Sequence, residues 1–173
     1  MRLGFEFYSS HAFDVAHELL GKYLCRKLDG ELIRIKITET ECYYGEEDSA
    51  CHAYRGKTER TKVMYEDGGR AYIYICYGLH NMLNIVTGVK NVPEAVLIRG
   101  AGEYNGPGKL TKGLKIDRSL NWENLIESNE LWLEDDGIKC SYKTEKRVGI
   151  HYAHDIDKNR LWRFLLNDKE HEK

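Results

Sequence analysis

Long apolar runs are absent from this sequence, and so is any excess of charge of one sign. No stretch approaches the ~20 apolar residues that cross a membrane, and the first ten residues, MRLGFEFYSS, lack the apolar core of a signal peptide. We therefore expect a cytoplasmic protein without membrane contact. The 26 Lys and Arg residues nearly balance the 28 Asp and Glu residues, which gives a formal net charge of −2. This balance argues against a strongly basic nucleic-acid-binding protein and against a disordered acidic chain.

Paired cysteine motifs are also missing. The cysteines are scattered and odd in number, and no C-x-x-C pair occurs among Cys25, Cys42, Cys51, Cys76 and Cys140. A disulfide framework is therefore not expected, and a reducing compartment fits better. Cys42, Cys51 and His52 form one candidate metal site, but their spacing matches no established zinc pattern. A metal site is accordingly not the favoured interpretation of these three residues.

The elements that are present predict one α+β domain, residues 1–173. Hydrophobic residues make up 42% of the chain, which suffices for an ordinary core. Ser9-Ser10 and Gly21 delimit a short predicted helix, and Asp29-Gly30 is a strong hairpin signal. Strands are expected at residues 23–28, 32–38, 71–77, 81–87 and 95–99, a helix at 109–114, and weaker strands at 131–134 and 147–150. This order predicts a mostly antiparallel, curved β-sheet with flanking short helices and a protruding β-hairpin.

The most informative segment is E-T-E-C-Y at residues 39–43, which follows an alternating run of isoleucines and basic residues. Alternation with period two is typical of a half-buried strand. If the strand continues, Glu39, Glu41 and Tyr43 share the apolar face of the isoleucines. A carboxylate there loses hydration and needs a partner or a purpose, and enzymes use such sites for general bases. The alternative is that the strand ends near Thr38 and both glutamates lie in a solvated loop.

Two basic segments and an aromatic hairpin point toward nucleic acid. Residues 55–62 and 109–118 are rich in Lys and Arg, and the glycines at 106 and 108 would let a phosphate approach the backbone near Lys109. The alternative is that each segment is simply a solvated face. Tyr72 and Tyr74 project to one face of the hairpin, and Tyr77 lies at its turn. That position suits stacking on bases or insertion between them, although strand tyrosines also pack in cores.

Six short motifs occur in the order E-T-E-C-Y, H-A-Y-R-G-K-T, Y-I-Y-I-C-Y-G, L-N-I-V-T, A-V-L-I-R and G-P-G-K-L. Together they resemble the alkyladenine (3-methyladenine) DNA glycosylases, which are monofunctional base-excision enzymes with a broad purine range. The resemblance covers residues 13–164. It implies an enzyme without metal or cofactor that acts as a monomer on double-stranded DNA containing modified purines, with a cytoplasmic, nucleoid-associated location.

The resemblance also implies roles for individual residues. Glu41 matches the general base that activates the attacking water, and Arg99 matches a residue near that water and the backbone of the target nucleotide. The walls of the base pocket match Tyr43, His52 and Tyr74, and Asn84 matches the position that selects against guanine. Tyr77 matches the side chain that fills the gap in the duplex. The remaining expected DNA contacts are Leu79, His80, Arg55, Lys57, Arg60 and Lys109.

This chain departs from the family pattern at three places. Cys42 replaces the usual alanine, His80 is a less usual residue beside the hairpin tip, and only residues 100–105 separate two motifs that normally flank a longer segment. The catalytic motifs are intact. The lesion could be 3-methyladenine, 7-methylguanine, hypoxanthine or ethenoadenine. The alternative function is a non-catalytic module that binds damaged bases, but such a module would not require Glu41.

Overall fold

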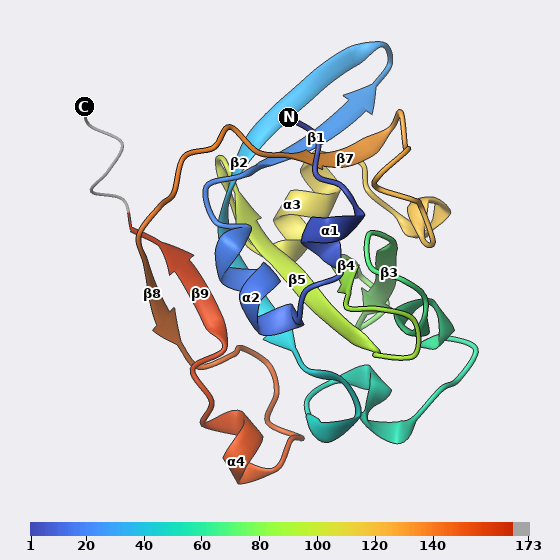
Figure 1. Ribbon diagram of the computed structural model, residues 1–173, viewed down its shortest axis with the longest axis vertical. Coiled ribbons are helices and arrows are strands. Elements are labelled where there is room, and N and C mark those ends of the chain that lie inside the picture. The colour runs from blue at the N-terminus through green and yellow to red at the C-terminus, as the bar shows by residue number, and fades with distance from the viewer. Residues whose placement is uncertain (168–173) are drawn as a thin grey trace.

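The computed structural model describes residues 1–167 and contains a nine-stranded sheet in which every strand pairing is antiparallel (Figure 1). The main path runs β3-β4-β5-β2-β1-β7, while β6 pairs with β5 and β9 pairs with both β2 and β8. The strands are β1 (Tyr23–Leu28), β2 (Glu31–Tyr43), β3 (Ala71–Cys76), β4 (His80–Thr87), β5 (Glu94–Ala101), β6 (Tyr104–Asn105), β7 (Leu131–Glu134), β8 (Tyr142–Glu145) and β9 (Arg163–Leu166). The predicted α+β fold is confirmed.

Short helices flank this sheet. They are α1 (Phe5–Tyr8), α2 (Ala12–Glu18), α3 (Pro107–Gly113) and α4 (Asp155–Lys158), together with the 3₁₀ turns η1 (Gly45–Glu47), η2 (His52–Arg55), η3 (Lys62–Tyr65) and η4 (Arg118–Leu120). The predicted Ser9-Ser10 cap of α2 is wrong, because the N-cap residue is His11 and its side chain makes no capping bond. Instead the buried Glu94 carboxylate of β5 accepts the Ala12 N–H at 2.7 Å. A distant strand therefore supplies the cap.

The hairpin between β1 and β2 forms as the sequence predicts. Asp29 and Gly30 both have positive φ, 50° and 84°, as a two-residue type I′ turn requires. However, β2 does not end near Thr38 but continues to Tyr43. Figure 1 shows this long strand running from the distal hairpin at the top into the middle of the sheet. The second half of β2 lies between β5 and β9.

A double irregularity in the middle of β2 changes which residues face the core. The register with β5 shifts between Ile37 and Glu39 and again between Glu39 and Thr40. Ile37 and Cys42 both belong to the core cluster that includes α2, although they are five positions apart. Glu41 therefore lies on the opposite face from the isoleucines, and the predicted shared face is wrong. An extra residue at a bulge inverts the alternation of a strand, and the sequence pattern does not reveal it.

The protruding hairpin is formed by β3 and β4, whose ends pair at Cys76 and His80. Its three-residue turn carries Tyr77 with φ 52°, and this side chain is 83% exposed. The first turn of α3 lies against the start of β4, beside the hairpin tip, since a Cβ atom at Gly108 would be 2.9 Å from His80 Nδ1. The hairpin and helix α3, which carries Lys109, are therefore neighbours.

The short connection at residues 100–105 is itself a small hairpin. Gly100 pairs with Asn105 and Ala101 with Tyr104, so only two residues form the turn between β5 and β6. Gly102 in that turn has a φ of 54°, which favours glycine. The segment thus leads directly into α3 without a longer excursion.

Candidate active site

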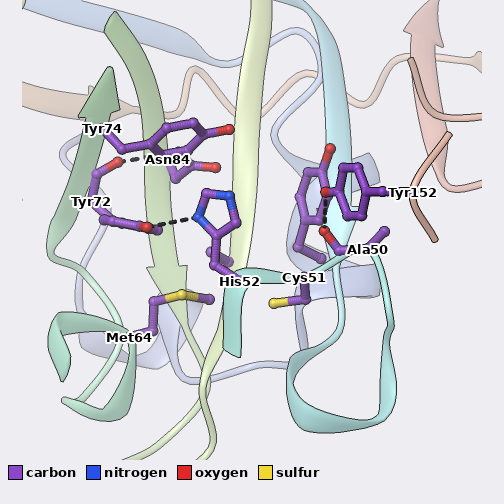
Figure 2. Close-up of a pocket in the computed structure, with 10 residues that line it drawn as sticks. Ala50, Cys51, His52, Met64, Tyr72, Tyr74, Asn84 and Tyr152 are labelled. Carbon is purple, nitrogen blue, oxygen red and sulfur yellow. Dashed lines mark hydrogen bonds between the residues drawn. The ribbon is translucent and has the colours of Figure 1, made fainter. Parts of the chain in front are cut away.

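A pocket opens on the face of the sheet opposite to α2. Its walls come from β2, β3, β4 and β5, from η2 and η3, and from the segment before α4; they are Tyr43, Ala50, Cys51, His52, Met64, Tyr72, Tyr74, Asn84, Ala95 and Tyr152 (Figure 2). Tyr43, His52, Tyr74 and Asn84, which the sequence nominated as a base pocket, meet here. The sequence did not predict Tyr152 as a pocket residue, because no local pattern links it to the other walls, about a hundred positions earlier.

His52 is held against the wall formed by β3. Its Nδ1 lies 2.7 Å from Tyr72 Oη, and its ring meets the Tyr74 ring edge-on with 4.5 Å between centroids. Figure 2 shows the imidazole between Tyr72 on one side and Tyr152 on the other. Burial, assisted by the positive charge of Arg60, lowers the pKa of His52 to about 4. The ring is therefore uncharged at neutral pH.

Glu41 is completely buried next to this pocket. Tyr43 connects the two, because its ring lines the pocket and its hydroxyl donates to Glu41 Oε1 at 3.0 Å. The backbone N–H of Val148 donates to Oε2 at 2.6 Å, and Arg99 Nη1 lies 3.5 Å from Oε1. Burial raises the pKa of the carboxyl group, while Arg99 opposes the shift. The Glu41 carboxylate is therefore buried, with defined donors on both oxygens.

Arg99 is part of a row of alternating charges. Its Nε lies 3.3 Å from Glu39 Oε1, and Arg163 Nη1 lies 3.0 Å from the same oxygen. Arg163 then bonds Glu145 at 2.6 Å. The guanidinium of Arg99 is thus shared between the carboxylates of Glu39 and Glu41.

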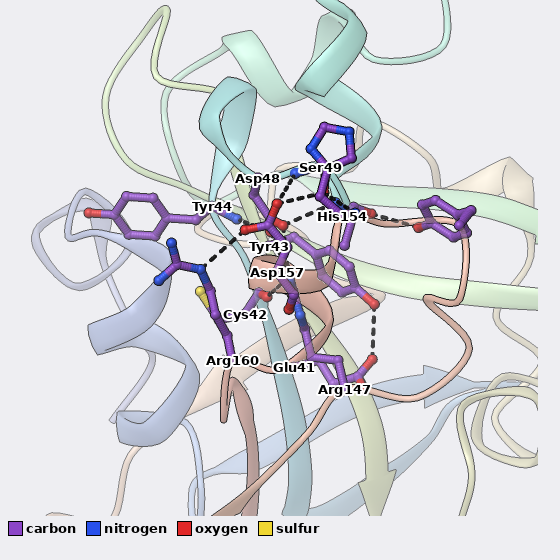
Figure 3. A network of polar contacts seen from close by, with 12 residues as sticks. Glu41, Cys42, Tyr43, Tyr44, Asp48, Ser49, Arg147, His154, Asp157 and Arg160 are labelled. Atoms are coloured by element: carbon purple, nitrogen blue, oxygen red, sulfur yellow. Dashed lines mark hydrogen bonds and ion pairs between the residues drawn. The ribbon is translucent and has the colours of Figure 1, made fainter.

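A buried ion pair holds the segment that carries Val148. Arg147 bonds Asp48 through both Nη atoms at 2.5 and 2.9 Å, and it also donates to the carbonyl oxygen of Cys42 at 2.9 Å (Figure 3). Its guanidinium carbon is 5.1 Å from the centroid of the Tyr43 ring. The predicted strand at residues 147–150 is wrong. These residues instead follow an irregular path beside β2 that brings the Val148 N–H to Glu41.

The expected DNA contacts are all exposed. Tyr77 and Leu79 at the hairpin tip are 83% and 76% exposed. The exposed basic candidates are Arg55, Lys57, Arg60, His80 and Lys109. Arg55 and Arg60 line an outer cleft that shares His52 and Tyr152 with the pocket. Arg55 and Arg60 thus border the pocket through this cleft, whereas Lys109 lies in α3, which packs against β4 of the hairpin.

The proposed metal ligands do not converge. Cys42 packs in the core cluster with α2, whereas Cys51 packs in the cluster beneath the pocket. No group of three or more metal-binding side chains gathers anywhere within residues 1–167. The metal hypothesis built on Cys42, Cys51 and His52 therefore has no geometric support.

Comparison with known protein families agrees with this geometry. The model of the family described as methylpurine-DNA glycosylase matches residues 6–104 and 102–170. This chain belongs to the methylpurine-DNA glycosylase family. The resemblance to alkyladenine DNA glycosylases is thereby confirmed, and the enzyme is favoured over the non-catalytic module. The two matched segments meet in the tight turn after β5.

Bacterial relatives provisionally named 3-methyladenine DNA glycosylase match almost the full chain. The protein of Borreliella burgdorferi strain ZS7 is 49% identical over 181 residues, which cover 95% of each chain. The relative from Natranaerobius thermophilus is 42% identical over 193 residues, covering 97% of this chain and 96% of its own. The relative from Clostridioides difficile strain 630 is 39% identical over 199 residues, covering 93% of this chain and 98% of its own. Within residues 1–167 of this family member, no helix is long and apolar enough to cross a membrane.

Proposed function

We propose that this family member excises 3-methyladenine and other modified purines from duplex DNA, with Glu41 as the general base. The observation that carries the proposal is the buried Glu41 carboxylate beside an aromatic pocket, held by Tyr43, Val148 and Arg99. The family supplies the reaction, hydrolysis of an N-glycosidic bond in DNA. The relatives are named for 3-methyladenine, which is therefore the first substrate to test.

The chemistry requires a group with the properties of Glu41. Breaking an N-glycosidic bond develops positive charge on the sugar, as in glycoside hydrolysis. The oxygen of a water molecule attacks C1′, its proton passes to Glu41, and the bond electrons leave with the base. The raised pKa of Glu41 increases its affinity for that proton. A cationic alkylated purine departs as a neutral base, whereas a neutral lesion such as hypoxanthine must be protonated.

The pocket is suited to a base taken out of the stack. Unstacking costs a few kcal/mol, which is least at damaged or mispaired sites. Stacking against Tyr43, His52 and Tyr74 returns part of that cost, and tyrosine faces attract a cationic ring. We assign Asn84, which is buried and donates to the carbonyl oxygen of Tyr72 at 3.2 Å, to discrimination against guanine.

The exposed residues around the pocket are assigned to the DNA. Tyr77 and Leu79 would enter the duplex where the base has left, since an apolar wedge replaces the lost stacking. The basic side chains would contact phosphates, and such contacts make affinity salt-dependent. The mechanism uses no amine nucleophile, so we expect the enzyme to release the base and leave the strand uncut. We also expect it to act as a monomer, as the resemblance implies.

Single-turnover release of 3-methyladenine from alkylated duplex DNA, in the presence of a chelator, tests the proposal. Glu41→Gln should bind the lesion duplex as the native protein does but release no base. Glu31→Gln, an exposed change at the start of the same strand, is the matched control and should retain full release. Equal release by Glu41→Gln would remove Glu41 from its role. Binding without release by the native protein would contradict the substrate assignment.

A further inference from the structure

Arg60 differs from the other basic residues of its loop because it contacts the wall of the pocket. Its Nη2 lies 3.3 Å from His52 Nε2, and its Nε donates to Tyr72 Oη at 3.2 Å. The guanidinium carbon also lies 5.1 Å from the centroid of the Tyr74 ring. One side chain therefore contacts three residues of the pocket.

These contacts determine which nitrogen of His52 carries hydrogen. A guanidinium group has donors only and does not lose its charge in proteins. The Nε2 atom that faces Arg60 must therefore accept, so it is unprotonated. The neutral ring then carries its hydrogen on Nδ1, which donates to Tyr72 Oη at 2.7 Å. In the imidazolium form an Nε2–H would point at the Arg60 cation, so Arg60 disfavours both the other tautomer and the charged ring.

The other groups around His52 do not supply a competing charge. Burial raises the pKa values of the pocket groups that titrate, so they are neutral near pH 7; these are Tyr43, Tyr72, Tyr74, Tyr152 and Cys51. Arg55 and His154 lie farther out, in the outer cleft that His52 also lines. The pKa of His52 is lowered to about 4, mainly by burial and further by Arg60.

We propose that Arg60 is a positioning residue that holds His52 in its Nδ1–H form and adds to the effect of burial in keeping the ring neutral, so that the pocket accepts cationic purines. This inference rests on the proposed function, since it gives the pocket a preference among modified bases. A protonated imidazole would repel a cationic ring stacked beside it, whereas a neutral imidazole can pack against that ring. A neutral lesion such as hypoxanthine would be far less sensitive to this charge.

Paired substitutions in the basic loop separate this role from phosphate binding. Arg60→Met removes the contacts with His52, and Arg55→Met removes an arginine from the same loop and the same outer cleft. Both side chains are exposed, so both variants should fold, which the unfolding temperature checks. The first readout is the pKa of His52 in the DNA-free protein, which an NMR titration measures. The second readout is single-turnover release of 7-methylguanine and of hypoxanthine as a function of pH.

Arg60→Met should raise the pKa of His52 above about 4, while burial, the larger cause, still holds it below the ordinary value near 6.5. Compared with the native protein, its ratio of 7-methylguanine release to hypoxanthine release should then fall more steeply as the pH is lowered toward about 5, because the variant ring is protonated more readily. Arg55→Met should leave the His52 pKa and the substrate ratio unchanged, even if it weakens DNA binding. An unchanged His52 pKa in Arg60→Met, or identical behaviour of the two variants, would overturn the inference. Because the NMR titration needs no DNA, it decides the point even if the native protein releases neither base.

Discussion

Replacing Arg147 by methionine should destabilise the protein by about 3–5 kcal/mol, because it leaves a buried carboxylate without its counter-ion. The side chains of Arg147 and Asp48 are 0% and 1% exposed, so water cannot solvate the charge that remains. The substitution also removes the donor to the carbonyl oxygen of Cys42. Urea unfolding at neutral pH gives the free energy directly.

A double-mutant cycle isolates the ion pair from the loss of packing. Asp48→Asn removes the charge of the carboxylate, so adding it to Arg147→Met should restore part of the lost stability. Arg160→Met is the matched control, because Arg160 also pairs with an aspartate and lies over the Trp162 ring, but its side chain is 40% exposed. Its cost should stay below about 1 kcal/mol, as for other partly solvated pairs. A similarly small cost for Arg147→Met, or strict additivity in the cycle, would refute the reasoning.

The same substitution should lower the rate of base release at temperatures where the variant is still folded. Arg147 precedes Val148, whose N–H bonds Glu41 Oε2, and its guanidinium lies over the Tyr43 ring. A hydrogen bond to a charged group contributes about 1.5–3 kcal/mol, so a displaced Val148 should slow release by about tenfold or more. Affinity for the lesion duplex should change less than the rate of release.

Three further predictions concern the pH dependence of release, the stability of Glu41→Gln and the hairpin tip. Burial raises the pKa of Glu41, so the acidic limb of 7-methylguanine release should have its midpoint above the ordinary value for glutamate; a midpoint at or below that value contradicts the assignment of Glu41. Because the folded-state pKa is raised, ionised Glu41 costs stability once the pH exceeds its unfolded pKa, and Glu41→Gln should raise the unfolding temperature at neutral pH but not in acid. Tyr77→Ser should weaken binding of lesion duplex without changing the unfolding temperature, since this side chain is 83% exposed; unchanged affinity counts against insertion.

The parts of the fold with local signals could be predicted from sequence. Period-two alternation and Asp29-Gly30 located the first hairpin, and the aromatic run around Tyr74 located the second. In each case the residues that form the turn adjoin the residues that pair. The pocket walls were identified through the family motifs, and the structure brings Tyr43, His52, Tyr74 and Asn84 together.

The parts that depend on distant residues could not be predicted in this way. The donor to Glu41 Oε2 is a backbone amide 107 positions away, and a backbone N–H carries no signature in the side-chain sequence. Strands β8 and β9 were missed because their short segments are partly exposed and pair with each other and with β2. Residues 147–150 look like a strand locally, but the ion pair of Arg147 with Asp48 holds them in an irregular path.

The irregularity in β2 resolves the problem that a buried glutamate poses. Had the alternation continued unbroken from Ile37, the carboxylate of Glu41 would face the apolar cluster under α2, where hydration would be lost without donors to replace it. The two register shifts instead turn Glu41 toward Tyr43 Oη, Val148 N–H and Arg99. The same shifts turn Thr40 toward α2, where its hydroxyl donates to the carbonyl oxygen of Ala16 at 2.7 Å. Glu41 and Thr40 therefore both find hydrogen-bond partners, on opposite faces of β2. In a regular strand neither residue would face these partners, so the bulge is a requirement of the site as well as a feature of the fold.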